Sequence, residues 1–181
     1  MVMVAIVGMP GAGRTIVSKM FEEKGFSRIR FGDITDQELK KRSMESTEEN
    51  ERFVRESLRV EHGPAAYAKM SFSKIKKAAT MSKNIVIDGL YSLEEFMFLR
   101  KKFPELVMLA VLASPEIRHE RLMKLEKNPL TLEECVFRDI SMLENLKLGG
   151  PICLADYFVI NEGNVSDLRK SAEKIFERLV K

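Results

Sequence analysis

The 181-residue sequence predicts an α/β fold in which helices cover both faces of a parallel β-sheet, and two features of the chain predict it. Short runs of Val, Ile and Leu recur along the chain, and such runs are typical of strands buried on both faces. Segments with helix-start signals separate these runs, and strands that alternate with helices favour a doubly wound parallel sheet. A chain of this length suits one such domain.

Five apolar runs are expected to form the strands of the sheet. They are residues 2–7, 28–31, 85–87, 106–112 and 157–160. The first run has no basic residues before it and leads directly into glycines, so we expect a strand rather than a signal peptide or a membrane span. We therefore expect a protein that stays in the cytoplasm.

Four helix starts are predicted from residues that cap helices. Ser46, Ser92 and Thr131 each precede a Glu by three residues, which is the capping-box pattern, and Ser114 precedes Pro115. Two connections between strands, residues 33–83 and 115–151, are longer than a crossover needs. Both are predicted to be mainly helical, and we expect them to cover a bound substrate.

The segment after the first strand fits the phosphate-binding pattern GxxxxGK[ST], with Arg14 in place of the lysine. Its residues are Gly8, Met9, Pro10, Gly11, Ala12, Gly13, Arg14 and Thr15. The glycines let backbone N–H groups turn inward around a phosphate, and the following helix adds its positive N-terminal end. Thr15 is placed to hold Mg²⁺ through its hydroxyl. The alternative is a glycine-rich turn that binds no ligand.

A second element fits the same metal–phosphate site. Asp88 follows the buried run at residues 85–87, and a carboxylate there suits a water-mediated contact to Mg²⁺. Asp88 could instead simply cap a turn. Because two separate elements fit one metal–phosphate site, the sequence predicts a nucleotide-binding protein.

With these residues in view, the chain resembles the archaeal adenylate-kinase-related family of P-loop proteins, which is similar to nucleoside monophosphate kinases and dephospho-CoA kinases. Besides the phosphate loop, the resemblance rests on Phe31-Gly32-Asp33, Leu58-Arg59, Gly63-Pro64, Val86-Ile87-Asp88-Gly89, Ser114-Pro115 through Arg121, Ala155-Asp156-Tyr157 and Asn161-Glu162-Gly163. It implies a P-loop kinase three-layer sandwich with a five-stranded parallel sheet of order 2-3-1-4-5. Residues 1–181 would form a single domain, with an acceptor-side helical region at 33–83 and a lid at 115–151.

The resemblance also implies roles for individual residues. ATP would contact Gly8, Gly11, Ala12, Gly13, Arg14, Thr15, Arg121, Asn161 and Gly163. The acceptor would contact Asp33, Arg59 and Gly89. Catalysis would use Arg14, Asp33, Arg118 and Arg121, and Mg²⁺ would use Thr15 and Asp88. Arg118 and Arg121 are three residues apart and share one helix face, although such a charged stripe is also typical of a solvated face.

Several positions depart from the family pattern. Arg14 replaces the lysine, and Asp36, Tyr91, Ile140 and Ser141 stand where the family has arginines. Arginine keeps the lysine's charge, but its planar fork is bulkier and differently aimed. Because phosphoryl transfer depends on positioning and charge neutralisation, the sequence supports nucleotide binding more directly than catalysis.

These features leave two leading functional hypotheses. One is a nucleotide kinase-type phosphotransferase that moves the γ-phosphate of ATP to a nucleotide-like small molecule, with adenylate and dephospho-CoA among the open acceptors. The other is a nucleotide-binding protein with weak or no transferase activity that acts as a sensor or partner.

Composition argues against other classes of partner and site. The basic runs at 40–42, 74–77 and 100–102 lack interleaved aromatic residues, and the net charge is only +3, so no nucleic acid is expected as a partner. No membrane partner is expected either. Two isolated histidines and two separated cysteines predict neither a zinc site nor a disulfide framework.

Overall fold

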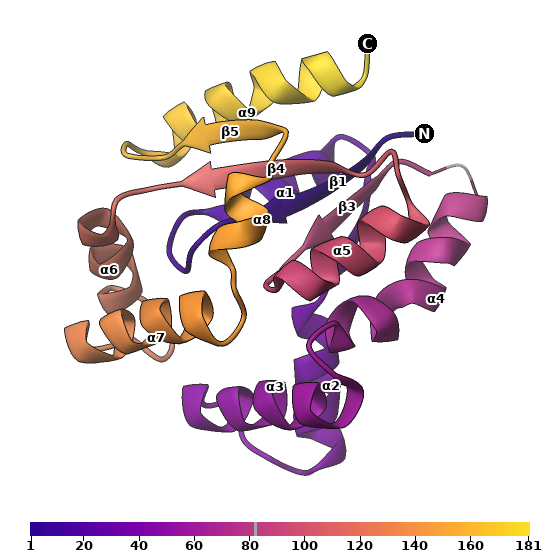
Figure 1. Cartoon of the computed structure of the whole chain (residues 1–181). Helices are drawn as coiled ribbons and strands as arrows, with labels where there is room; N and C mark the ends of the chain where they lie inside the picture. The colour runs from indigo at the N-terminus through magenta and orange to yellow at the C-terminus, as the bar shows by residue number, and fades with distance from the viewer. Residues whose placement is uncertain (82) are drawn as a thin grey trace.

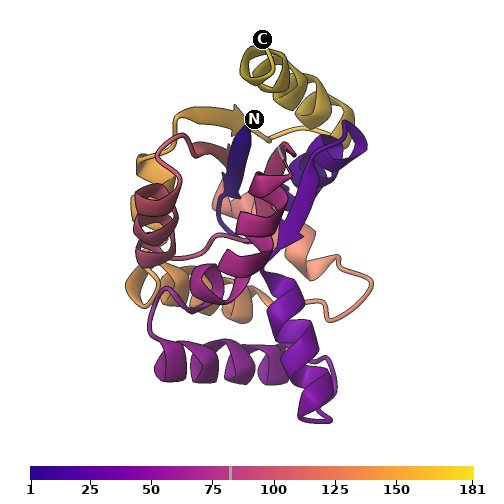
Figure 2. The ribbon, with the colours of Figure 1, turned by 90° about the vertical axis from the view of Figure 1, so that its right-hand side faces the viewer.

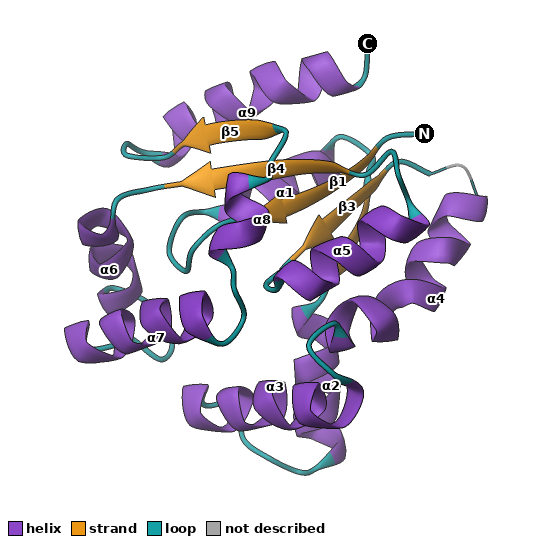
Figure 3. Cartoon of the chain, in the orientation of Figure 1, coloured by secondary structure: helices purple, strands orange, loops and turns teal. Residues whose placement is uncertain are grey.

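A five-stranded parallel sheet lies at the centre of the chain (Figures 1 and 3). The computed structural model describes residues 1–81 and 83–181. The strands are β1 (Met3–Val7), β2 (Ser27–Arg30), β3 (Ile85–Asp88), β4 (Val107–Leu112) and β5 (Tyr157–Ile160). Their order is β2-β3-β1-β4-β5, and every neighbouring pair is parallel. The predicted fold class and strand order are therefore confirmed.

Helices cover both faces of this sheet, as the view in Figure 2 shows. On one face lie α1 (Arg14–Glu23) and α9 (Val165–Leu179), which pack against Val4 and Ile6 of the central strand. On the other lie α4 (Ala66–Thr80), α5 (Leu93–Lys102) and α8 (Gly149–Cys153). Because side chains alternate along a strand, β1 contributes to both cores, which explains its uninterrupted apolar sequence.

The other four helices lie beyond the carboxyl ends of the strands (Figure 1). They are α2 (Gly32–Lys41), α3 (Glu48–His62), α6 (Pro115–Met123) and α7 (Leu132–Glu144). The first two belong to the long connection at 33–83 and the last two to the connection at 115–151. Ligands of open α/β sheets bind at this edge, so both connections stand where they can cover a substrate.

Two of the predicted capping boxes are confirmed, and two helix starts differ in detail. Ser92 and Thr131 each exchange hydrogen bonds with the Glu three residues later. The prediction for Ser46 is wrong, because Thr47 caps α3 while the Ser46 hydroxyl donates to Glu51 at 3.0 Å. Ser114 does occupy the N-cap position before Pro115, but its hydroxyl makes no cap hydrogen bond.

The Ser114 amide and hydroxyl instead donate to the Glu162 carboxylate, at 2.7 and 3.0 Å. This pair of hydrogen bonds ties the start of α6 to the loop after β5. Of the described helices, none combines the length and the apolar composition that a membrane span requires.

The caps generate a stability prediction. Ser92 is fully buried, accepts from the Glu95 amide at 3.0 Å and donates to the Pro64 carbonyl at 2.9 Å. Ser92→Ala should therefore lower the free energy of unfolding by about 1–2 kcal/mol. The matched control Ser46→Ala, at an exposed position, should stay within about 0.5 kcal/mol of the unmodified chain. Urea denaturation measures both, and equal losses would contradict this assignment of the caps.

Candidate functional site

The loop at residues 8–15 joins β1 to α1 and is packed so closely that it requires glycine. Gly11 has φ 79° and Gly13 has φ 103°, a region that side-chain-bearing residues avoid. A Cβ at Gly13 would lie 2.5 Å from Nδ2 of Asn161, and one at Gly11 would lie 2.6 Å from the Arg118 carbonyl oxygen. The loop therefore touches its neighbours through bare backbone.

The loop also presents amide groups to a ligand. Across residues 1–81 and 83–181, no acceptor is present for the N–H groups of Gly11, Gly13, Arg14 and Thr15. The Ala12 amide is the exception, because it donates to the Met9 carbonyl at 3.2 Å. Free amides at the positive N-terminal end of a helix suit an anion such as phosphate.

Side chains from distant elements hold the loop carbonyls. Asn161 Nδ2 donates to the Ala12 carbonyl at 2.7 Å, and Arg118 Nη1 donates to the Pro10 carbonyl at 3.1 Å. In a trans peptide the C=O and the next N–H point in opposite directions. Holding these carbonyls against Asn161 and Arg118 therefore turns the following amides, of Gly13 and Gly11, the other way.

Arg121 joins the same arrangement from α6. Its Nη2 donates to the carbonyls of Asn161 and Gly163, at 3.1 and 3.0 Å, and its Nη1 lies 3.4 Å from the Gly11 carbonyl. A cavity of about 570 Å³ is lined by this guanidinium, the phosphate loop, Asn161, Gly163 and Leu122. The structure thus brings the phosphate loop together with Arg121, Asn161 and Gly163, the other residues predicted to contact the nucleotide.

Arg14, which replaces the motif's lysine, contacts Tyr91 directly. Its Nη2 donates to the Tyr91 hydroxyl at 3.2 Å, and its Cζ lies 4.5 Å from the centre of the Tyr91 ring. The Nη1 atom is buried and has no hydrogen-bond partner in the described part of the chain. The positive charge of Arg14 lowers the pKa of the Tyr91 phenol below its ordinary value. The sequence pattern did not indicate this contact.

Asp88 is buried and already paired. Its Oδ2 accepts from Arg28 Nη2 at 2.6 Å, Arg28 Nε at 3.2 Å and Ser18 Oγ at 2.8 Å. Ser18 Oγ also lies 3.1 Å from the Thr15 carbonyl oxygen, so this hydroxyl stands between the two residues predicted to serve Mg²⁺. Sequence reasoning missed both Ser18 and Arg28 here. The metal role of Thr15 and Asp88 stays a prediction.

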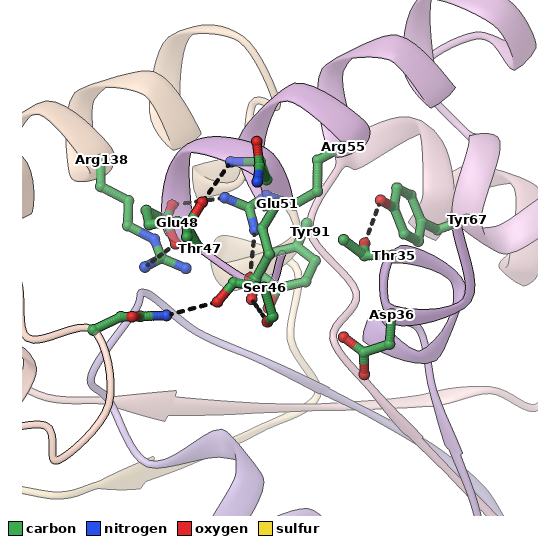
Figure 4. Close-up of polar contacts among 12 residues, drawn as sticks. Thr35, Asp36, Ser46, Thr47, Glu48, Glu51, Arg55, Tyr67, Tyr91 and Arg138 are labelled. Carbon is green, nitrogen blue, oxygen red and sulfur yellow. Dashed lines mark hydrogen bonds and ion pairs between the residues drawn. The ribbon is translucent and has the colours of Figure 1, made fainter. Parts of the chain in front are cut away.

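A second cavity, of about 980 Å³, lies between α3 and α7. Arg55 Nη2 and Arg138 Nη1 reach the Glu48 carboxylate from these two helices, at 2.7 and 3.4 Å (Figure 4). The Nε atoms of Arg59 and Arg138, both residues that line the cavity, are buried and have no partner among the described residues. Cationic side chains therefore line the cavity.

The residues predicted to bind the acceptor are spread over this region. Arg59 lines the cavity, with Nη2 3.5 Å from Oε1 of the fully buried Glu95 and Cζ 4.8 Å from the centre of the Tyr67 ring. Burial raises the pKa of Glu95, against the lowering effect of Arg59. Asp33 is not among the cavity's lining residues, and its carboxylate lies 3.2 Å from Arg30 Nη1.

Two further positions named in the sequence analysis are Asp36 and Gly89. Asp36, which stands where the family has an arginine, also contacts Arg30 Nη1, at 2.5 Å. Arg30 thereby supplies a cation beside the carboxylates of Asp33 and Asp36. Gly89, predicted to contact the acceptor, has φ 95° and adjoins Tyr91.

The buried Arg118 guanidinium binds both the phosphate loop and helix α7. It makes a bidentate ion pair with Asp139 of α7, at 2.8 and 2.7 Å, in addition to its bond to the loop. His119 Nε2 lies 2.9 Å from the same carboxylate. Arg118 therefore connects α7 to the phosphate loop, and its predicted catalytic role stays a prediction.

Known proteins are similar to this chain in sequence over most of its length. Residues 4–136 match a protein family described as an AAA domain. A UPF0200 protein of Thermococcus gammatolerans is 35% identical over 182 residues, and the match covers 98% of this chain and 95% of the relative.

Two solved structures share the fold at low sequence identity. Shikimate kinase from Bacteroides thetaiotaomicron has a TM-score of 0.63 at 15% identity, with 99% of both chains covered. Dephospho-CoA kinase from Campylobacter jejuni has a TM-score of 0.57 at 14% identity, with 97% of this chain and 96% of that chain covered.

The Arg118–Asp139 pair generates a pH-dependent prediction. Burial works to raise the pKa of Asp139, but hydrogen bonds from Arg118 and His119 outweigh it and hold the pKa below its usual range. The pair's stabilisation is therefore full above the unfolded pKa, about 3.9, and is lost as pH falls through the folded pKa. Asp139→Asn should lower the free energy of unfolding by about 2–3 kcal/mol at pH 7.

That loss should shrink progressively below about pH 4, where the unfolded carboxylate begins to bind protons that the native one does not, and it should level off once the native carboxylate is protonated too. Denaturant titrations of both proteins from neutral to acid pH measure the difference. The control is Asp167→Asn, which changes a carboxylate in an exposed pair with Lys170. It should have little effect on the free energy of unfolding at neutral or at acid pH. A loss for Asp139→Asn that stayed constant with pH would rule out the pair as its cause.

Proposed function

The chain belongs to the family that its AAA-domain match and its UPF0200 relatives define, and we propose that it is a nucleotide kinase-type phosphotransferase. In this proposal it binds ATP with Mg²⁺ and transfers the γ-phosphate to a nucleotide-like small molecule. The P-loop kinase-like fold supports nucleotide binding of this kind.

One observation carries the proposal. The loop with free amides opens onto the cavity lined by Arg121, Asn161 and Gly163. A nucleotide has the matching two parts, because its phosphates suit the amides and its flat base suits a planar guanidinium. In the proposed complex the phosphates lie within the loop at 8–15, and the adenine lies against the flat face of the Arg121 guanidinium, beside residues 161–163.

The remaining donor-side roles follow from charge and position. Arg14 has an unpartnered Nη1 that can donate to a phosphate oxygen of the donor. The Thr15 hydroxyl and, through water, Asp88 would hold Mg²⁺, which neutralises phosphate charge in this class of reaction. Arg28 and Ser18 hold the Asp88 carboxylate in position through their hydrogen bonds.

The cavity between α3 and α7 is the proposed acceptor site. The cationic side chains of Arg55, Arg59 and Arg138 on its walls favour a negatively charged group on the acceptor. Its volume of about 980 Å³ leaves room for a molecule of nucleotide size. The solved structures of similar fold include kinases named for shikimate and for dephospho-CoA, which supports a small-molecule acceptor.

A second candidate function is a nucleotide-binding protein with weak or no transferase activity. The observation that favours it is the engagement of Asp88 by Arg28 and Ser18, since a carboxylate neutralised in this way attracts a metal ion less strongly. The two candidates predict the same ATP binding and differ in product formation.

The first test is ATP binding by calorimetry in the presence of Mg²⁺. We expect binding by the unmodified chain and its loss in Gly13→Ala, because the added Cβ would push Asn161 away from the loop. Gly25→Ala is the matched control, since Gly25 also has a positive φ but its Cβ would meet nothing within 4 Å. It should bind ATP normally while losing about 1 kcal/mol of stability. Absence of ATP binding by the unmodified chain would refute the proposal.

The second test is product formation. Incubation with ATP and Mg²⁺ plus AMP or dephospho-CoA, read by mass spectrometry, should yield a phosphorylated acceptor. Gly13→Ala should yield none. If ATP binds but neither acceptor nor a wider set of small hydroxyl compounds is phosphorylated, the second candidate function replaces the first.

The base site has its own prediction. Arg121→Ala should weaken ATP binding by about 1–2 kcal/mol, because it removes a cation positioned to stack on the base. Lys124→Ala, at an exposed position just after the same helix, should leave the affinity unchanged. Calorimetry of both variants measures these affinities. An ATP affinity of Arg121→Ala equal to that of Lys124→Ala would show that Arg121 does not contact the base.

A further inference from the structure

The donors of Arg14 must be oriented toward a phosphate, whereas those of a lysine at the same position could rotate to reach it. A lysine ammonium is a compact charge with rotatable donors, whereas the arginine guanidinium is a rigid plane whose donors point in fixed directions. An arginine in the phosphate loop therefore serves a phosphate only if something orients its plane. The side chain that touches this plane is Tyr91.

Resting on the function proposed above, we propose that Tyr91 is the positioning residue that orients Arg14 toward the donor phosphates. The ring, 4.5 Å from Cζ, fixes the guanidinium plane, and the hydroxyl, 3.2 Å from Nη2, fixes its rotation. Arg14 Nη2 is thereby bound to Tyr91, while Arg14 Nη1 is buried and has no hydrogen-bond partner among the described residues. Arg14 also lines the cavity beside the loop, where the donor is expected.

Tyr91 is itself held firmly enough to act in this way. Its amide donates to Glu95 Oε2 at 2.8 Å, and that fully buried carboxylate also accepts from the Ser92 amide at 3.2 Å. Gly89 makes room for the ring, since a Cβ there would lie 3.2 Å from Tyr91 Cε2. A side chain fixed at its backbone and packed along its ring can hold a second side chain in a set direction.

The pairing also explains why a tyrosine suits position 91. The contact places the guanidinium over a ring face, which attracts a cation, and beside a hydroxyl, which accepts its hydrogen bond. A cationic side chain at that distance would repel Arg14 instead. Arg14 and Tyr91 therefore form one functional unit although they are far apart in the sequence.

A purely structural role for Tyr91 makes a different prediction. Its ring also packs against the hydrophobic core, so a core-filling role would lower stability and weaken all ligands alike. An orienting role would act on the phosphates alone and only while Arg14 is present. ATP and adenosine, which share the base but not the phosphates, separate the two.

The experiment is a double-mutant cycle with Mg²⁺ present, in which calorimetry gives the affinities for ATP and for adenosine. Tyr91→Phe keeps the ring and removes the hydroxyl, and it should weaken ATP binding by about tenfold, the size expected of one hydrogen bond to a charged group. Adenosine affinity should change by less than about twofold. In the Arg14→Lys background the same substitution should change ATP affinity by less than about twofold, because the orienting contact is already absent.

Two further variants complete the design. Tyr91→Leu removes ring and hydroxyl together and should weaken ATP more than Tyr91→Phe does, with adenosine again unaffected. Tyr157→Phe, which removes a hydroxyl at the first residue of β5, is the matched control and should change neither affinity. Far-ultraviolet circular dichroism of each variant confirms that it is folded before affinities are compared.

Three results would overturn the role of Tyr91. They are an unchanged ATP affinity in Tyr91→Phe, an equal loss for ATP and adenosine, and a loss of the same size whether or not the chain also carries Arg14→Lys. Each leaves the proposed function standing as long as the unmodified chain binds ATP. If the unmodified chain does not bind ATP, the proposed function fails, and the role of Tyr91 fails with it.

Discussion

The hydrogen bond from the Asn161 side chain to the Ala12 carbonyl is the contact on which the rest of the candidate site depends. It spans 2.7 Å, is buried, and joins the phosphate loop to the end of β5. It turns the adjacent amide of the loop toward the ligand side, and it leaves no room for a Cβ at Gly13. Arg121 in turn binds the Asn161 carbonyl, so the loop, the β5 end and α6 form one unit.

Ion pairs extend this unit to α7 and α3. Arg118 binds both the loop and Asp139 of α7, and Arg138 of α7 reaches Glu48 at the start of α3 (Figure 4). The ring of Phe137, also on α7, lies 5.7 Å from the guanidinium carbon of Arg52 on α3. The predicted lid and the predicted acceptor-side region are thus linked electrostatically, and a charged ligand between them would compete for these same groups.

The parts of the fold that depend on nearby residues could be predicted from the sequence. The buried strands, the glycines of the loop and the capping boxes at Ser92 and Thr131 are local patterns with one physical solution. The sequence could not distinguish a cap at Ser46 from one at Thr47, because both are hydroxyl residues directly before the helix. In the folded chain Thr47 accepts from the Asn50 amide, whereas Ser46 donates to the Glu51 carboxylate.

The parts of the site that depend on tertiary contacts could not be predicted. The pairing of Asp88 with Arg28 and the stacking of Arg14 on Tyr91 join residues of different elements, and no spacing rule relates them. The cavity between α3 and α7 likewise arises from the packing of two long connections. A family pattern indicates which positions matter, whereas only the folded chain indicates which charges already have partners.

The proposed function requires the amides of the loop at 8–15 to hold a nucleotide's phosphates. A crystal structure of the chain with a non-hydrolysable ATP analogue and Mg²⁺ tests it most directly. We expect phosphate oxygens within hydrogen-bond distance of the Gly13, Arg14 and Thr15 amides, with the base beside Arg121 and Asn161. A nucleotide bound elsewhere, with these amides facing no phosphate, would contradict it.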